Sequence, residues 1–256
     1  MINDVTVTTW THSSYSDVWP VYYGQYEEMA PFLKHAVFLN EPSDGLPDYC
    51  KQVINTEGDP FYKRLIESLN EIEDEIILFS LEDFILYDSV KEDTIKNIIS
   101  YLRHSEYDFV RLIRSGINEG MTGPSKLVDA DLGLYEVPFN CDYVFSLQAS
   151  LWKKQSLINH FNCYKPANFM ESELNGSNSA RRFNNLKGMF VWNNEPNCKG
   201  DFIADHSDSS TFPFMASALH GGSYGNPSKW VTSLYRDRLV PLFEKYKIDP
   251  AIRGEC

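Results

Sequence analysis

The 256-residue sequence lacks the cysteine patterns that organise small secreted domains or zinc sites. It has five cysteines, an odd number, and no two of them form a Cys-x-x-Cys pair. A disulfide framework normally uses an even set of cysteines, and a zinc ribbon needs two such close pairs. We therefore expect free thiols in a reducing compartment.

Long apolar runs are missing as well. No stretch approaches the roughly 18–20 apolar residues of a membrane span. The first residues, Met1-Ile-Asn-Asp, contain neither the basic region nor the apolar run of a signal peptide. The sequence therefore predicts a soluble protein located in the cytoplasm.

Positive charge is scarce. The chain has 23 Lys and Arg against 36 Asp and Glu, which gives a formal net charge of -13. Proteins that bind nucleic acid place clustered Lys and Arg against the phosphates. We therefore expect no nucleic-acid partner, although a local basic pocket for one diphosphate is compatible with this charge.

Motifs of several enzyme classes are absent too. The chain has no Gly-x-x-x-x-Gly-Lys-Ser/Thr loop and no Gly-x-Gly-x-x-Gly. The sequence therefore gives no support for a P-loop nucleotide site or a Rossmann dinucleotide site. It also has no His-Glu-x-x-His pair. Any catalytic chemistry must come from residues outside these patterns.

What the chain does contain is ample apolar sequence, with 43% hydrophobic and 14% aromatic residues. Residues 5–10 and 36–39 predict strands, and residues 18–29 between them predict a helix. Strand, helix, strand is the rhythm of a parallel sheet. We expect one α/β domain over residues 1–256, with a mixed, mainly parallel sheet flanked by helices.

The remaining elements are predicted from periodicity and turn residues. Two long stretches with little periodicity, residues 115–132 and 193–225, are predicted loops, and loops of that length are usually functional or disordered. The other predictions are strands at 50–55, 109–113 and 188–192, a strand pair at 135–139 and 143–147, helices at 61–72, 91–104, 149–161 and 229–246, and a polar loop at 166–179.

One stretch joins a buried strand to two carboxylates. Apolar residues 76–79 lead into Glu82 and Asp83, and residues 84–86 are apolar again. Such a run is typical of a strand buried on both faces, and a carboxylate is costly to bury without a partner. Ligands of open α/β sheets bind outside the carboxyl ends of the strands, where paired carboxylates suit a divalent cation that carries a phosphate. The alternative is that the two residues open a solvated turn.

Three short segments carry a resemblance to a known family. They are Phe61-Tyr-Lys-Arg-Leu-Ile-Glu-Ser-Leu69 with Ile76-Ile-Leu-Phe-Ser-Leu-Glu-Asp-Phe84, then Phe145-Ser-Leu-Gln-Ala-Ser-Leu-Trp152, then Met170-Glu-Ser-Glu-Leu-Asn-Gly-Ser177. They resemble, in order, the helix and strand before the acidic metal motif, the strand and helix that shape the acceptor side, and the acidic stretch with the catalytic base, in the GT-A class of nucleotide-sugar-dependent glycosyltransferases. The family signature is usually Asp-x-Asp, whereas this chain has Leu81-Glu82-Asp83.

The resemblance implies a GT-A-like, Rossmann-like fold. Residues 1–114 would form the half that binds the nucleotide sugar, and residues 115–256 the half that binds the acceptor. The implied activity is transfer of a sugar from a nucleoside-diphosphate donor to a glycan or other hydroxyl acceptor, assisted by Mn²⁺ or Mg²⁺ and inverting at the sugar carbon.

The resemblance also implies roles for particular residues on the donor side. Asp83 would hold the cation with help from Glu82, and His206, or else His220, would complete its shell. A cation bridging the two phosphates neutralises the leaving group. The nucleotide is expected at the end of the first strand. The donor residues are Thr8, Thr9, Trp10 and Arg64, with Arg111, Arg114, Arg181 and Arg182 as further phosphate candidates.

On the acceptor side, a carboxylate must take the proton from the attacking hydroxyl. Glu173 is the first candidate for this base and Glu171 the second. In an extended segment these alternate positions face opposite ways, so only one of the two would enter the site. A solvated position for both is the alternative.

Two other functions stay open. A nucleotidyltransferase has a similar layout and acidic metal site, but usually a Gly-rich basic loop after the first strand, where this chain has His12-Ser-Ser-Tyr-Ser. A non-catalytic glycan-binding module would bind sugar without nucleotide and would tolerate loss of Asp83.

Overall fold

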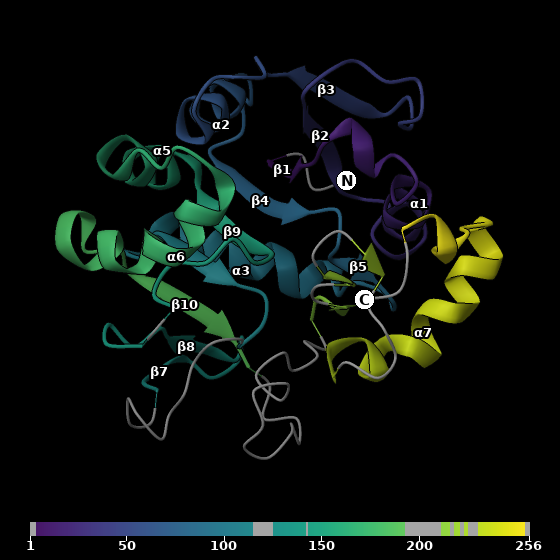
Figure 1. Cartoon of the computed structure of the whole chain (residues 1–256). Coiled ribbons are helices and arrows are strands. Elements are labelled where there is room, and N and C mark those ends of the chain that lie inside the picture. Colours follow the sequence, from purple (N-terminus) through teal and green to yellow (C-terminus); the bar gives the residue numbers. More distant parts are fainter. Residues whose placement is uncertain are drawn as a thin grey trace.

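The computed structural model describes residues 4–114, 125–141, 143–192, 211–215, 218–220, 223–224 and 230–253 (Figure 1). The first part alternates strands and helices, as predicted. Its elements are β1 (Val5–Trp10), α1 (Trp19–Met29), β2 (Lys34–Leu39), β3 (Cys50–Ile54), α2 (Phe61–Asn70), β4 (Ile76–Leu81), β5 (Ile85–Leu86), α3 (Glu92–His104) and β6 (Phe109–Arg111).

The later part is less regular. It contains β7 (Leu127–Asp129), β8 (Leu134–Glu136), β9 (Ser150–Lys153), α5 (Lys154–Tyr164), α6 (Phe169–Ser179), β10 (Gly188–Val191), β11 (Phe214–Met215), β12 (Leu219–His220), β13 (Ser223–Tyr224) and α7 (Trp230–Tyr246), followed by a short 3-10 turn, Pro250–Ile252.

Among the residues that the structure describes, nine strands form one sheet in the order β3-β2-β1-β4-β9-β6-β10-β8-β7. The pairings β1–β2, β1–β4, β2–β3 and β6–β10 are parallel, whereas β8 and β9 run against their neighbours. Seven strands therefore point one way and two point the other. The predicted mixed, mainly parallel α/β class is confirmed.

The sheet is covered on both faces. On one face, Leu78 of β4 packs in a cluster with Tyr22 of α1 and Ile95 of α3. On the other, Phe79 packs with Leu65 of α2 and residues of α5. Successive side chains of β4 thus enter different clusters, as the alternation of a strand requires. Each such side chain contributes about 1.5–3 kcal/mol by leaving water, so this central strand is strongly fixed.

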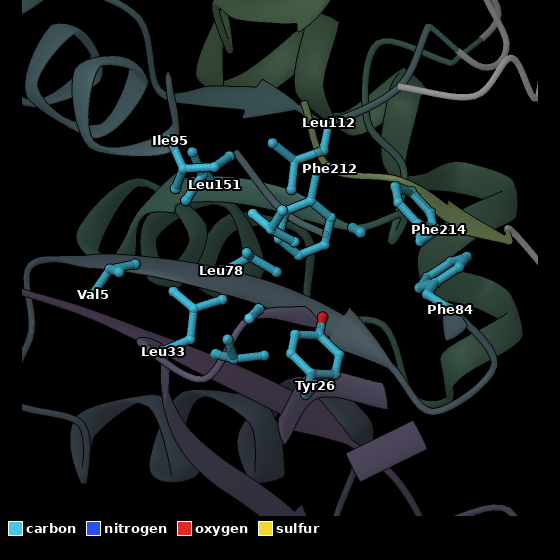
Figure 2. Packing of buried hydrophobic residues seen from close by; sticks show 14 of the residues in the cluster. Val5, Tyr26, Leu33, Leu78, Phe84, Ile95, Leu112, Leu151, Phe212 and Phe214 are labelled. Carbon is cyan, nitrogen blue, oxygen red and sulfur yellow. The ribbon is translucent and has the colours of Figure 1, made fainter. Parts of the chain in front are cut away.

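Figure 2 shows the first of these clusters from close by. Leu78 lies between Tyr26 of α1 and Leu151 of β9, with Phe212 nearby from the late part of the chain. A smaller cluster joins Val21 of α1 to Ile85 of β5 and to residues of β11 and α7. In the part of the chain that the structure describes, none of the helices has the length and apolar character that crossing a membrane requires.

The sheet corrects the predicted helix at 149–161. Its first residues form β9, which lies between β4 and β6 and pairs antiparallel with both. Trp152 stacks on Phe109 of β6 at 4.4 Å between ring centroids. Because β9 fills the gap between two strands that are distant in sequence, its partners and not its local periodicity fix its conformation. The helix starts only at Lys154.

The predicted strand at 143–147 is wrong as well, and its proposed partner, the strand near 135–139, pairs elsewhere. Residues 143–147 form no strand, although Phe145 is fully buried. The hydroxyl of Ser177 accepts a hydrogen bond from the Phe145 N–H at 3.1 Å and donates one to its carbonyl oxygen at 3.0 Å. A side chain therefore satisfies this backbone in place of a neighbouring strand. The strand near 135–139 is β8, which pairs with β7 and β10.

Most of the polar stretch 166–179, which was predicted as a loop, is the helix α6, and this helix starts at Phe169. The Asn168 side chain accepts a hydrogen bond from the Glu171 N–H at 2.9 Å, and the Glu171 carboxylate accepts one from the Ala167 N–H at 2.8 Å. These bonds satisfy N–H groups at the start of α6 that have no partner within the helix. Cys50, Cys141 and Cys163 are free thiols, as expected, and the other two cysteines lie outside the described residues.

Candidate active site

The carboxyl ends of the parallel strands lie side by side. They form the edge of the sheet that runs across the strand ends, and not an edge strand. Trp10, the last residue of β1, pairs with Phe38 of β2 on one side and with Leu81 of β4 on the other. Because β9 runs the opposite way, its first residue, Ser150, reaches the same region as the partner of Phe79. Side chains that follow these strand ends therefore converge. They include those of Thr11, Asn40, Asn55, Glu82 and Asp83.

Glu82 lies inside this edge and not on a solvated turn. Its side chain is only 9% exposed. Burial raises the pKa of the Glu82 carboxyl to about 7, while hydrogen bonds with its own backbone and with Thr11, and the charge of Arg253, act to lower it. Near neutral pH this carboxyl exists in both protonation states, so it can donate as well as accept a hydrogen bond.

Asp83 is half-buried and lies against the late part of the chain. Its carbonyl oxygen accepts a hydrogen bond from the Ala218 N–H at 2.9 Å. His220, in β12, comes two residues after Ala218, so the backbone of that candidate histidine follows directly on this contact with Asp83. The side chain of His220 and the whole of His206 lie outside the described residues.

A cation from the far end of the chain lies beside the acidic pair. Arg253 donates from Nε to Asp17 at 2.7 Å and from Nη2 to the Ser14 carbonyl at 2.6 Å. Its guanidinium also lies 4.3 Å from the centroid of the Tyr15 ring. Burial and then the charge of Glu82 raise the pKa of Tyr15. The loop after β1 is thus held by the C-terminal segment next to Glu82, a contact that no local sequence pattern indicates.

Two predicted nucleotide residues are brought together at the same edge. The Arg64 guanidinium lies 5.1 Å from the centroid of the Trp10 ring, and its Nε donates to Asn55 Oδ1 at 2.7 Å. Trp10 in turn meets Phe61 edge-on at 4.9 Å. Asn55 was not predicted, although an asparagine directly after a strand is a readable signal. Its Nδ2 is buried and has no hydrogen-bond partner among the described residues.

Thr8 and Thr9 are placed differently. Both are fully buried, because β1 is an interior strand with neighbours on both sides. The Thr9 hydroxyl bonds to the Tyr22 hydroxyl at 3.1 Å, and Thr8 lies at 3.5 Å from the Leu78 carbonyl. In this structure neither hydroxyl is available to a ligand.

The other candidate arginines have contacts within the protein. Arg111 is fully buried, donates to the Tyr143 carbonyl, and has a pKa that burial lowers to about 10. Arg114 lies 4.5 Å from the centroid of the Trp192 ring. Arg181 donates to the Cys141 carbonyl at 2.6 Å. Arg182 is exposed.

The predicted acceptor segment lies next to the predicted donor residues. Phe169, the first residue of α6, meets Phe61 at 5.6 Å, and Phe61 meets Trp10. The first two N–H groups of α2 donate to the carbonyls of Ala167 and Pro166, at 2.8 and 3.3 Å. A chain of direct contacts thus joins the start of α6 to the end of β1.

Glu171 and Glu173 both lie on α6, but the structure describes only the side chain of Glu171. The Glu171 carboxylate is engaged at the helix start, as described above. The side chain of Glu173 lies outside the described residues.

The residues that the structure describes contain no group of three or more His, Cys, Asp or Glu side chains placed to hold a metal ion. Mg²⁺ and similar hard cations take about six oxygen ligands and often bind through one or two carboxylates plus substrate phosphates. The acidic pair therefore fits a cation only together with oxygens that a bound diphosphate and water supply.

No family model matches the sequence, and no curated protein matches it. Solved structures do. The mannosyltransferase PcManGT from Pyrobaculum calidifontis, solved with GDP-Man and Mn²⁺, is 14% identical with a TM-score of 0.47, over 78% of this chain and 59% of that one. TarS 1-349 from S. aureus is 14% identical with a TM-score of 0.44, over 73% and 60%.

A nucleotidyltransferase is among the matches as well. CMP:2-keto-3-deoxy-manno-octonic acid synthetase, solved with CTP, is 10% identical with a TM-score of 0.45, over 74% of this chain and 89% of that one. This chain thus spans about 60% of the length of TarS 1-349 and PcManGT. At these identities and TM-scores the likeness carries no inference about substrate or mechanism.

Proposed function

We propose that this protein is a glycosyltransferase that moves a sugar from a nucleoside-diphosphate donor to a hydroxyl acceptor. The observation that carries the proposal is the position of Glu82 and Asp83. They follow the central strand directly, at the edge where Trp10 and Arg64 also meet. An acidic pair beside an aromatic ring and a guanidinium has the groups needed for a nucleoside diphosphate and the cation that accompanies it.

On the donor side we assign Asp83 to the cation and Trp10, Arg64 and Asn55 to the nucleotide. A bound cation would neutralise charge on the diphosphate that leaves. Asn55 supports this assignment because its buried Nδ2 has no hydrogen-bond partner among the described residues and can donate to a base or ribose oxygen. We assign Glu82 to a sugar hydroxyl, since a buried carboxyl with a pKa of about 7 is partly protonated at neutral pH and a weak cation ligand.

On the acceptor side we assign Glu173 as the general base. Glu171 already accepts a hydrogen bond at the start of α6, which explains why an acidic residue stands there. The contacts from Phe169 through Phe61 to Trp10 support this assignment, because they join the start of this helix to a residue that we assign to the donor. A base on this side suits a single displacement with inversion. The cytoplasm stays the predicted location.

The deciding experiment is thermal unfolding with a panel of nucleoside mono-, di- and triphosphates, with and without Mn²⁺. A ligand at about 100 times its Kd stabilises the fold by about 2.7 kcal/mol. For a chain of this length that corresponds to a rise in Tm of roughly 5–10 °C. We expect one diphosphate to stabilise the wild-type protein, Mn²⁺ to strengthen the effect, and Asp83→Asn to lose it.

Asp48→Asn is the matched control, because Asp48 is an exposed aspartate away from this edge and should leave the effect intact. A response confined to triphosphates would favour a nucleotidyltransferase instead. No response to any nucleotide by the folded protein would overturn the proposal in favour of a glycan-binding module.

A further inference from the structure

A cavity lies at the opposite ends of the strands from the candidate active site. Its volume is about 700 Å³, and its wall includes Thr6 near the start of β1 and Lys34, His35 and Ala36 at the start of β2. The candidate active site lies at the last residues of the same strands, so the two places are separated by the length of the sheet. A volume of this size is within the range of small-molecule sites, roughly 300–1,000 Å³.

The inner wall of the cavity is aromatic. His35 is 4% exposed, and its ring centroid lies 4.8 Å from that of Tyr26 and 5.7 Å from that of Tyr49, both of which also line the cavity. No described residue supplies the His35 Nδ1 with a hydrogen-bond partner. Burial lowers the pKa of His35 to about 3, so the imidazole is neutral at physiological pH. A neutral buried imidazole with hydrogen-bonding capacity left over favours a polar ligand that brings its own partner.

The rim of the cavity is acidic. The carboxylates of Glu27, Glu71 and Glu73 form no ion pair with any residue that the structure describes, whereas Asp74 pairs with Lys34 at 2.8 Å. Lys51, the other cation of the rim, is occupied by the Glu71 carbonyl. The helices α1 and α2 both end at this cavity, and helix C-termini carry partial negative charge. Four carboxylates against the two ammonium groups of Lys34 and Lys51 leave the lining with a formal charge of -2, which attracts cations.

We propose that this cavity binds a small organic cation, an ammonium group carried on a flat aromatic body. The aromatic body would lie against Tyr49, which is 46% exposed, in front of the buried rings of Tyr26 and His35. This suits both ring stacking and attraction between a cation and a ring face. The ammonium would face the rim carboxylates. Anions are disfavoured by the same charges. This site does not depend on the function proposed for the other edge of the sheet.

The test uses three indole probes that share one ring and differ in charge: tryptamine, tryptophol and indole-3-propionate. We expect isothermal titration of the full chain to show binding of tryptamine, binding of tryptophol at least about 5-fold weaker, and no binding of the propionate. A loss of about 5-fold corresponds to roughly 1 kcal/mol, which is the size of one exposed electrostatic contact or cation–ring contact.

Two sets of variants locate the site. Glu27→Gln combined with Glu73→Gln should weaken tryptamine binding at least about 10-fold, while Glu41→Gln, an exposed glutamate away from the cavity, should leave it within twofold. The rim glutamates are exposed, so these changes leave the fold intact, which Tm confirms. His35→Phe keeps the ring and removes the nitrogen, and it should weaken tryptamine binding as well.

Three results would overturn the proposal. They are equal affinity for the three probes, tryptamine affinity unchanged in the rim double variant, and no tryptamine binding by the folded wild-type protein at millimolar concentration. None of these results bears on nucleotide binding, so the two sites are judged separately.

Discussion

Glu82 with Asp83 and Glu171 with Glu173 are two of the acidic pairs of the chain, and they lie in very different surroundings. The first pair ends a buried strand, where Glu82 is 9% exposed and burial raises its pKa to about 7. The second pair lies on a helix, where Glu171 bonds to the backbone at the helix start. Closely spaced acidic residues can thus belong to a buried site or to a helix terminus. The secondary structure of the segment in which they lie determines which of the two it is.

The largest expected effect is on the catalytic rate, and it distinguishes the role of Glu173 from that of Glu171. If Glu173 is the base, Glu173→Gln should lower release of nucleoside diphosphate from the donor by about 10²–10⁴-fold, the usual contribution of a general base. Glu171→Gln is the matched change, because glutamine also serves at this position of a helix start, and activity should stay within twofold. Steady-state rates with the donor found by the binding panel measure both. Equal losses in the two variants would contradict the division of roles.

The next effect is on stability as pH changes, through Glu82. Its folded pKa of about 7 lies above the unfolded value near 4.5, so the folded state holds the proton more tightly. The stability that this group contributes is present below about pH 4.5 and is lost as pH rises through about 7. Glu82→Gln removes this loss. From pH 5 to pH 8, the stability of the wild type relative to the variant should fall by about 2–3 kcal/mol.

Denaturant unfolding of the two proteins across this pH range measures the difference. His35 and His160, whose pKa values burial lowers to about 3 and about 4, titrate in the opposite sense, but they are present in both proteins and cancel. A difference that stays constant with pH would mean that Glu82 is solvated, like an ordinary surface glutamate.

The smallest effect concerns the start of α6. Asn168→Ala removes the side chain that accepts from the Glu171 N–H, and it should cost about 1 kcal/mol of unfolding free energy, or roughly 2–4 °C in Tm. Asn162→Ala, on the exposed surface of α5, is the control and should cost nothing. Thermal unfolding of both variants is sufficient. If Asn168→Ala leaves the Tm unchanged, the hydrogen bonds at the start of α6 do not explain the position of the second acidic pair.

Much of the fold was predictable because local periodicity and sheet geometry agree. Strand β1 spans the predicted residues 5–10, and β4 and α2 begin where their apolar patterns begin. The position of Trp10 beside Leu81, the residue before Glu82, also followed from sequence, since the carboxyl ends of neighbouring parallel strands lie together. The roles assigned to these residues stay predictions.

The rest depends on partners that are distant in the chain. β9 is a strand because β4 and β6 flank it, and Arg253 reaches Tyr15 from the other end of the sequence. Neither contact leaves a local pattern. Thr8 and Thr9 were expected to face a ligand, but strands on both sides and helices on both faces enclose them. By contrast, the start of α6 was readable, because asparagine followed three residues later by glutamate is a helix-start pattern.

The position of β9 has a consequence for how the chain reaches this structure. On a ribosome, β4 and β6 emerge well before the strand that belongs between them. Until residue 153 has been made, each of the two offers an open hydrogen-bonding edge, and such edges recruit other strands. Because β6 pairs only with β9 and β10 among the described strands, it cannot join the sheet until these later strands have been made. A polypeptide cut at residue 114 would therefore leave β6 unpaired and one side of β4 open, and it would aggregate.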